Sequence, residues 1–414
     1  MPPPTIHDAI AHHQQGRLAE AESTYLQLLN AQPKDVDALH YLGVLRMRQG
    51  RRDEAIELIK RSLNISPRNP DAWNNLGNML LAGNDEKAAE FAYSNATNQK
   101  PDYAEAWYNL ANLYRRQRRR DEAVRSYRRV LELNPRFAGA YENIAMLLLR
   151  IGRPDLTADV YRRWLAVEPD NPIARHMAAA FSNQPTPERA DDAYVATVFD
   201  RFADNFDEAL ANLHYAAPGL LTAALSEVIA FGERRLAILD AGCGTGLCGP
   251  LLRSSARQLV GVDLSAGMLA KARERKVYDE LHESELVAFM RAHPKGFDVV
   301  ISADTLVYFG ALVEAMSAAA TALKAGGVLA FTLEAEAVGS ADKFRLHQSG
   351  RYSHSADYAR DCLEAAGFEV LLIEGGVLRK EAGADVLGHV ILAKMGTHLN
   401  AESGSPPRHP TAPP

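Results

Sequence analysis

Apolar positions in the first 170 residues recur with a helical period, inside larger units that repeat every 34 residues. Prolines mark the longer period at Pro33, Pro67, Pro101, Pro135 and Pro169. Small residues and tyrosines keep the same step, which places two helices in each unit. A single unit of this kind can bury its apolar face only against a neighbour. The pattern therefore predicts five helical hairpins stacked into a solenoid, of which the first is degenerate and the fifth drifts.

Downstream of residue 230 the pattern changes to short apolar runs that alternate with helical segments. The runs predict strands over residues 236–239, 258–263, 281–286, 297–304, 328–333, 368–373 and 386–393. Strands alternating with helices indicate a parallel sheet, and the close spacing of the last two indicates a hairpin at its edge. Ahead of the sheet, residues 194–225 predict an amphipathic helix.

The length of the chain and a break in its helical pattern predict two domains. Its 414 residues exceed the usual size of one hydrophobic core. Two prolines near residue 187 break the helical pattern and stiffen the connection. We expect a solenoid with a closing helix over residues 1–182, a linker over 183–190, a second domain over 191–395 and a disordered tail over 396–414.

The stretch from Leu236 to Gly249, LAILDAGCGTGLCG, reads as a strand, a glycine-rich turn and the start of a helix. Glycines let a ligand lie against the backbone, and helix amides face it with partial positive charge. The segment Gly244–Gly249 fits the dinucleotide pattern G-x-G-x-x-G. Asp240 argues against that ligand, because a carboxylate repels a pyrophosphate. A ligand with an ammonium and a sulfonium would instead be attracted.

The sequence D-A-G-C-G-T-G resembles the first motif of class I S-adenosylmethionine-dependent methyltransferases. The spacing of 34 residues is the period of the tetratricopeptide repeat (TPR). Both halves together resemble predicted bacterial methyltransferases that carry TPR repeats. The resemblance implies a multidomain protein, with an all-α TPR solenoid followed by a Rossmann-like, seven-stranded class I methyltransferase domain. It also implies S-adenosylmethionine as the cofactor. In this family, aromatic residues near the N-terminus close over the cofactor, which makes Tyr194, Phe199, Phe202 and Tyr215 candidates.

A second acid ends the next predicted strand, at Asp263, where a carboxylate can accept hydrogen bonds from two ribose hydroxyls. The segment that follows resembles the family's D-h-S-x-x-M-L, and the family's acid near adenine corresponds to Ser284 and Glu285, with Glu283 as a competitor. The expected cofactor-binding residues are Asp240, Gly242, Cys243, Gly244, Gly246, Asp263, Leu264, Met268, Ser284, Glu285, Asp304 and Thr305.

Candidate catalytic residues come from two segments near the expected mouth of the site. By resemblance, Asp304, Thr305 and Tyr308 face the point where methyl donor and acceptor meet. Tyr352 and His354, beside Arg351 in the loop expected after the fifth strand, supply a possible base and a cation for an acidic acceptor. The alternative is a loop whose polar residues satisfy the local backbone.

Asparagines recur in phase with the repeats. They occupy the sixth position at Asn75, Asn109 and Asn143, and the ninth at Asn78 and Asn112. One interpretation is an amide ladder that binds the backbone of an extended peptide, similar to that of O-GlcNAc-transferase-type TPRs. The other is that asparagine is simply tolerated on a solvated helix face.

Composition narrows the remaining possibilities. Residues 1–180 carry 25 Lys and Arg against 22 Asp and Glu, and the rest carry 21 against 30, so a nucleic-acid substrate is not expected. Three scattered cysteines suggest neither disulfides nor a metal site, and a cytoplasmic protein without a membrane span is expected. The function indicated is methyl transfer to a protein or peptide recruited by the repeats. Alternatives are a small-molecule or carrier-bound acceptor, and a non-catalytic scaffold that senses S-adenosylmethionine.

Overall fold

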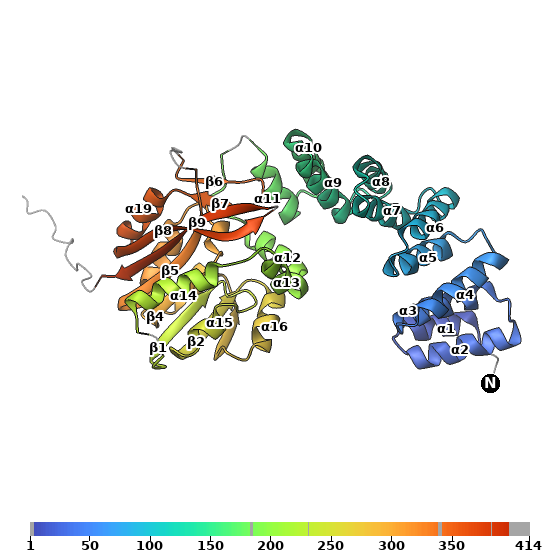
Figure 1. Cartoon of the computed structure of the whole chain (residues 1–414), viewed down its shortest axis with the longest axis horizontal. Helices are drawn as coiled ribbons and strands as arrows, with labels where there is room; N and C mark the ends of the chain where they lie inside the picture. The colour runs from blue at the N-terminus through green and yellow to red at the C-terminus, as the bar shows by residue number, and fades with distance from the viewer. Residues whose placement is uncertain (1–3, 183–184, 231, 338–341, 382, 397–414) are drawn as a thin grey trace, which may run out of the picture. The chain divides into compact units, whose positions relative to one another are not determined.

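The computed structural model describes residues 4–182, 185–230, 232–337, 342–381 and 383–396. Two compact units make up the chain, residues 1–169 and 170–414 (Figure 1). The first is all-α and the second is α/β, which confirms the predicted fold class. The expected linker at 183–190 lies partly outside the described residues, and so does the expected tail, apart from Gly396.

Helices pair into five hairpins within the described residues of the first unit. Their bounds are α1 (Ile6–Gln14), α2 (Leu18–Ala31), α3 (Val36–Arg48), α4 (Arg52–Ile65), α5 (Pro70–Ala82), α6 (Glu86–Gln99), α7 (Ala104–Arg116), α8 (Arg120–Leu133), α9 (Ala138–Arg150) and α10 (Pro154–Val167). Each hairpin packs against the next one along the chain, as a solenoid requires.

The repeated small residues fall where two helices of a hairpin approach most closely. A Cβ atom added at Gly43 would lie 2.9 Å from the side chain of Ile59, and one added at Gly77 would lie 2.5 Å from the ring of Tyr93. Ala21 and its three counterparts in the following repeats are fully buried. The 34-residue pattern is therefore a packing pattern, set by the distance between paired helices.

The second unit combines helices with one sheet. Its helices are α11 (Pro172–Ala180), α12 (Asp192–Phe202), α13 (Phe206–Asn212), α14 (Ala217–Val228), α15 (Gly249–Leu252), α16 (Ala266–Glu274), α17 (Leu286–Ala292), α18 (Val313–Ala322) and α19 (Ala356–Ala365). Its strands are β1 (Leu236–Ala241), β2 (Ala256–Asp263), β3 (Glu280–Glu283), β4 (Phe297–Ser302), β5 (Leu323–Ala335), β6 (Phe344–Leu346), β7 (Tyr352–His354), β8 (Phe368–Glu381) and β9 (Ala384–Met395).

Strand β1 lies at the centre of the parallel part of the sheet. The order β3-β2-β1-β4-β5 is parallel, β9 pairs with β5 in the antiparallel direction, and β8 pairs with β9. All seven predicted strands are present, and the late hairpin forms the expected edge. The short strands β6 and β7 were not predicted.

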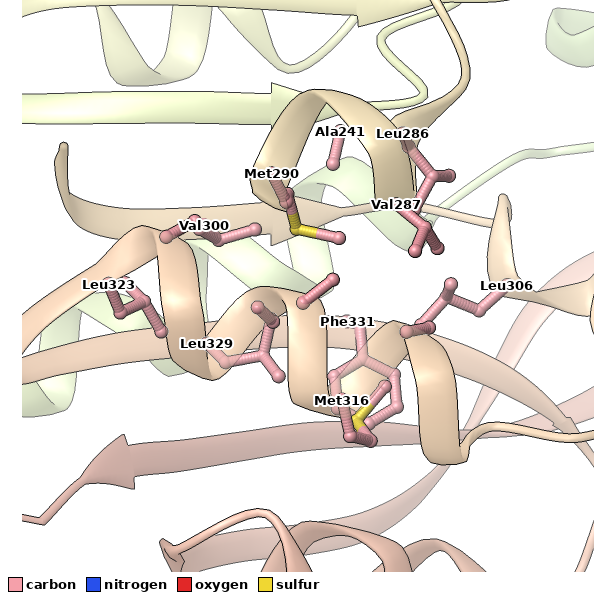
Figure 2. Packing of buried hydrophobic residues seen from close by; sticks show 14 of the residues in the cluster. Ala241, Leu286, Val287, Met290, Val300, Leu306, Met316, Leu323, Leu329 and Phe331 are labelled. Carbon is pink, nitrogen blue, oxygen red and sulfur yellow. The ribbon is translucent and has the colours of Figure 1, made fainter. Parts of the chain in front are cut away.

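Helices cover both faces of this sheet, which gives a three-layer core. On one face, residues of α17, α18 and α19 pack against the sheet, and Figure 2 shows Met290 and Met316 against Val300, Leu329 and Phe331. On the other face, α14 and α15 supply the cover. The central strands are buried on both sides, which explains their continuous apolar sequence.

Three boundaries differ from the sequence prediction. The closing helix expected for the repeats, α11, belongs to the second unit, because the ring of His176 stacks on Tyr194 of α12 at 4.0 Å. The single helix predicted over 194–225 is divided into α12, a short 3₁₀ turn, α13 and α14. The expected loop at 348–354 ends in strand β7. Within the described part of the chain, every helix is too short or too polar to cross a bilayer.

Candidate functional site

A cavity of about 320 Å³ opens at the carboxyl ends of β1, β2 and β4 in the second unit. The chain leaves β1 for β2 on one side and returns to β4 on the other, so the strand order reverses here. Ligands of open α/β sheets bind at such a reversal, because the loops diverge and leave a crevice.

Most of the predicted cofactor-binding residues meet in this cavity. Its lining includes Asp240, Gly242, Cys243, Gly244, Asp263, Leu264, Ser284, Glu285, Asp304 and Thr305. Two predicted residues do not line it. Met268 is fully buried in the fold, and Gly246 faces the ring of Tyr278. The aromatic candidates Tyr194, Phe199, Phe202 and Tyr215 all line the cavity.

Asp240, at the end of β1, is 1% exposed. One of its carboxylate oxygens accepts a hydrogen bond of 2.6 Å from the hydroxyl of Tyr278. Burial raises the pKa of Asp240 to about 7; the hydrogen bond from Tyr278 opposes this shift, and the nearby Asp263 adds to it. Asp240 is therefore a carboxylate whose ionisation responds to its partners near neutral pH.

Asp263, at the end of β2, joins three parts of the site. Its two oxygens accept hydrogen bonds from the amide of Gly244 at 2.8 Å and from the amide of Ser265 at 2.9 Å. Ser265 in turn caps α16. Burial raises the pKa of Asp263, and these backbone hydrogen bonds lower it. The contacts fix the carboxylate at the lip of the cavity.

The glycine loop owes its shape to backbone conformations that other residues avoid. Gly242 and Gly244 have φ values of 77° and 54°. A Cβ atom at Gly242 would lie 2.3 Å from the side chain of Thr305, whose hydroxyl donates a 3.1 Å hydrogen bond to the carbonyl of Gly242. Above Gly244 the nearest side chain, Phe206, is 3.9 Å from the same position, which leaves space for a ligand.

Ser284 and Glu285 line the cavity from the start of α17, whereas Glu283 does not. Glu285 caps this helix by accepting hydrogen bonds from the amides of Val287 and Ala288 at 3.0 and 2.7 Å. Its side chain is therefore held by the fold at the edge of the cavity.

Asp240 and Asp263 share an unusual property. Neither carboxylate has a Lys, Arg or His partner among the described residues, although Asp240 is fully buried and Asp263 is half-buried. Negative charges that are largely withdrawn from water and lack a counter-ion are costly, so two of them in one cavity favour a cationic ligand. Among the described residues no group of His, Cys, Asp or Glu could hold a metal ion.

A cluster of paired charges also lines the cavity, and only part of it could be expected from the sequence. Arg379 of β8 contacts three carboxylates: Asp304 at 2.5 Å, Glu381 at 2.7 Å, and Glu334. Arg351 binds Glu334 and Glu381 at 2.6 and 2.5 Å. Burial raises the pKa of Asp304, and Arg379 opposes this shift. These residues lie far apart in the chain, so no local motif reveals the cluster.

The catalytic candidates Tyr308, Tyr352 and His354 lie in different surroundings. Tyr308 lines the cavity, and burial raises its pKa to about 12. Tyr352 and His354, which are fully buried in β7, do not line it. The Tyr352 hydroxyl donates to the carbonyl of Pro187, and Nε2 of His354 lies 3.1 Å from the carbonyl of Gly310. Burial lowers the pKa of His354 to about 4. The structure gives both side chains packing partners and does not bring them to the site.

The segment 199–210 covers the cavity and is tied to its floor by acids. Asp200 accepts hydrogen bonds from Ser265 Oγ at 2.5 Å and from the amide of Gly267 at 3.1 Å. Asp207 accepts a hydrogen bond of 2.5 Å from Thr245 Oγ1 and forms an ion pair with Arg275. We call these two groups of contacts the cover latches. They hold the aromatic cover directly above the glycine loop.

In the first unit, each asparagine of the predicted ladder has a partner inside the fold. The amides of Asn75, Asn109 and Asn143 lie 2.9–3.2 Å from the side chains of His40, Asn74 and Tyr108, each one repeat earlier. Asn78 and Asn112 accept hydrogen bonds from the hydroxyls of Tyr93 and Tyr127 at 2.7 and 2.6 Å. The asparagines thus connect helices within the solenoid, and peptide binding by them stays a prediction.

Both halves of the chain match models of known protein families. Residues 238–327 match the family model described as a methyltransferase domain. Three models described as tetratricopeptide repeats match residues 9–70, 46–114 and 104–137.

Several curated proteins are similar to the second half. Human methyltransferase-like protein 27 is 37% identical over 25% of this chain and 43% of its own length. Malonyl-(acyl-carrier protein) O-methyltransferase of Salmonella typhimurium is 30% identical over 33% of this chain and 52% of its own length. The probable S-adenosylmethionine-dependent methyltransferase CRG1 of Saccharomyces cerevisiae is 25% identical, over 45% and 65%. The chain spans about half the length of the first two relatives.

Solved structures are similar to the repeats. The structure of MamA is 25% identical over 39% of this chain and 94% of its own, with a TM-score of 0.37. YrrB, a TPR protein with an unusual peptide-binding site, is 20% identical over 41% and 88%, with a TM-score of 0.36. Because these TM-scores are low, the assignment of the repeats rests on the family models and the helix pattern. The chain is therefore a tetratricopeptide-repeat protein whose second half carries a class I methyltransferase domain.

Proposed function

We propose that this chain transfers a methyl group from S-adenosylmethionine to an acceptor that the repeats help to recruit. The observation that carries this proposal is the pair of carboxylates in the cavity, the fully buried Asp240 and the half-buried Asp263, which have no cationic partner among the described residues. S-adenosylmethionine brings an ammonium and a sulfonium, so it supplies the missing positive charge. A dinucleotide would bring a pyrophosphate, which the same carboxylates repel.

The residues of the site fit this donor. Asp263 can accept hydrogen bonds from ribose hydroxyls, and Gly244 leaves room above the loop. When bound, the donor supplies a methyl carbon on a sulfonium, open to in-line attack by a nucleophile. The aromatic cover over the cavity excludes water, and alignment of the two reactants is the main contribution of the protein.

The charges of the cavity favour an acceptor that is not an anion. Each arginine that lines the cavity is already paired with at least two carboxylates: Arg189 with Asp192 and Glu285, and Arg351 and Arg379 with the cluster described above. A carboxylate acceptor would therefore meet no unmatched cation there. We favour an uncharged nucleophile, such as a neutral amine or a hydroxyl, presented by a protein.

A carrier-bound acceptor is the second candidate. It is favoured by the names of the relatives, several of which are malonyl-(acyl-carrier protein) O-methyltransferases. The pairing of the arginines disfavours it. In this case the repeats would serve assembly alone.

Calorimetry with S-adenosylmethionine and S-adenosylhomocysteine tests the donor. We expect the full chain to bind both, and Asp240→Ala and Asp263→Ala to weaken binding at least tenfold, about 1.4 kcal/mol. Asp361→Ala is the control, since this exposed acid of α19 does not line the cavity. Absence of binding by the wild type contradicts the proposal, and so does an affinity that is the same in both variants as in the wild type.

Labelled donor in a cell lysate tests the acceptor. We expect label in protein, and less of it when an excess of residues 1–169, the first compact unit, competes for the recruited protein. Labelling of malonyl-acyl-carrier protein, unaffected by the competitor, would support the second candidate instead. Donor binding without any transfer would favour a scaffold that only senses the donor.

A further inference from the structure

Among the described residues, Tyr278 alone forms a side-chain hydrogen bond with the Asp240 carboxylate, and it has no place in the sequence motifs of the site. It lies between α16 and β3, outside the residues that line the cavity. Its hydroxyl nevertheless reaches Asp240 at 2.6 Å. The ring therefore approaches this carboxylate from behind the glycine loop, on the side away from the ligand space.

Three glycines create the space that the ring occupies. A Cβ atom would lie 2.8 Å from the ring at Gly246 and at Gly249, and 3.1 Å from it at Gly261. Real Cβ atoms essentially never approach a ring carbon as closely as 2.8 Å, so an alanine at either of the first two positions would displace the tyrosine. We call this space the glycine socket. It explains why Gly246 does not line the cavity although it belongs to the glycine loop.

We infer that Tyr278 is a positioning residue of the donor site, which orients the Asp240 carboxylate and favours its charged form. The inference rests on the proposed function, because the charged form matters only if the ligand is a cation. A hydrogen bond donated to one oxygen stabilises the ionised carboxylate and leaves the rest of the group to face the ligand.

The surroundings of Asp240 leave this task to Tyr278. Besides the tyrosine, the titratable groups that act on Asp240 or respond to it are Asp263, Cys243, Cys248 and Tyr215. None of these carries a positive charge, and Asp263 repels it. Tyr278 is thus the group that opposes the effect of burial on the pKa of Asp240.

The test compares Tyr278→Phe with the wild type in the full chain. The variant keeps the ring in the glycine socket and removes only the hydroxyl. We expect the ¹³Cγ titration of Asp240 in the free protein to move upward by about one pH unit or more, the size expected for a lost hydrogen bond to a charge. We expect the pH midpoint of S-adenosylhomocysteine affinity to move with it, so that affinity at pH 7 falls about fivefold.

Two further variants make the result specific. A Cβ atom at Gly249 would lie 2.7 Å from the side chain of Val277 and 2.8 Å from the ring of Tyr278, so Gly249→Ala should displace the ring together with its neighbour and produce the same shift. Combining it with Tyr278→Phe should add little more to the titration of Asp240. Tyr358→Phe is the matched control: this buried tyrosine accepts a hydrogen bond from the amide of Leu312 and does not line the cavity. We expect it to leave both midpoints unchanged.

An unchanged titration of Asp240 in folded Tyr278→Phe protein would overturn the inference. So would a shift of equal size in Tyr358→Phe. If the wild type binds no S-adenosylhomocysteine at any pH, the proposed function fails separately. The titration of Asp240 would then still decide whether Tyr278 controls the carboxylate.

Discussion

At the scale of single residues, Asp240 meets two opposing demands. Folding favours a neutral side chain at this position, because the carboxylate is almost fully buried. A cationic donor favours a charged one. The protein keeps an acid whose pKa is raised to about 7, so ligand-free protein carries a charge that costs stability at the upper end of physiological pH.

Asp240→Asn tests this conflict. The folded state binds the proton of Asp240 more tightly than the unfolded state, whose pKa is the ordinary 3.8. The stability due to this group is therefore complete below about pH 4 and is lost as the pH rises to about 7. We expect the asparagine variant to unfold a few degrees above the wild type at pH 8, with little difference at pH 4.5, and to bind the donor poorly. Thermal denaturation without ligand measures this, and an equal gain at both pH values would contradict it.

The sequence predicted those site residues whose position depends only on neighbouring residues in the chain. Gly242, with its positive φ, and the acids that end β1 and β2 follow directly from strand, turn and helix signals. Arg379 and Tyr278 were missed, because their partners lie 75 and 38 residues away and no spacing rule connects them. His354 was misplaced for the opposite reason: its polar neighbours suggested a loop, whereas the fold buries it in a strand.

At the scale of elements, the cover segment is the part of the second unit most directly tied to the ligand space. It is divided into α12, a 3₁₀ turn and α13. Asp200 and Asp207 attach it to the start of α16 and to the glycine loop. Its phenylalanines line the cavity, so we expect loosening of these contacts to speed the entry and release of a donor.

Asp207→Ala tests the cover latches. The substitution removes the hydrogen bond from Thr245 and the ion pair with Arg275. Since charge-assisted hydrogen bonds contribute about 1.5–3 kcal/mol, we expect hydrogen exchange in residues 203–212 to quicken at least tenfold, with faster donor dissociation. Asp204→Ala is the control, because its side chain is 87% exposed and pairs with Lys271 at the surface. Similar exchange in both variants would rule out a special role for Asp207.

The repeats show which elements a sequence can predict well. Their helices follow from a period that packing repeats in every hairpin, so the five hairpins could be predicted from the sequence. The division of the helix predicted over 194–225 was not, since its apolar positions continue through the breaks. The in-phase asparagines left a peptide ladder and a solvated helix face as alternatives, and the structure adds a third role, because each asparagine has a partner within the solenoid.

At the scale of the whole molecule, the boundary between the two units lies after residue 169, earlier in the chain than the prolines near residue 187 suggested. Helix α11 belongs with the α/β unit, where Nε2 of His176 lies 2.8 Å from the carbonyl of Gly350. The prolines near residue 187 interrupt helical periodicity but do not separate the domains. Sequence signals report where a helix ends, and long-range contacts decide to which core it belongs.

Two fragments test this division. We expect residues 170–414 to fold and to bind S-adenosylhomocysteine as the full chain does, because α11 keeps its partners. Residues 183–414 lack His176 and its stacking on Tyr194, and we expect a loss of about 1–3 kcal/mol in the free energy of unfolding. Urea denaturation of both fragments measures the difference. Equal stabilities would place α11 with the repeats.

The glycine socket also constrains how this chain can change over generations. A mutation that enlarges Gly246 or Gly249 expels the aromatic ring, while one that shrinks Tyr278 leaves a void behind the loop. Neither step is harmless alone, so these positions should drift together or not at all. Descendants with an alanine in the loop are expected to carry a smaller residue at position 278 and another means of stabilising the acid.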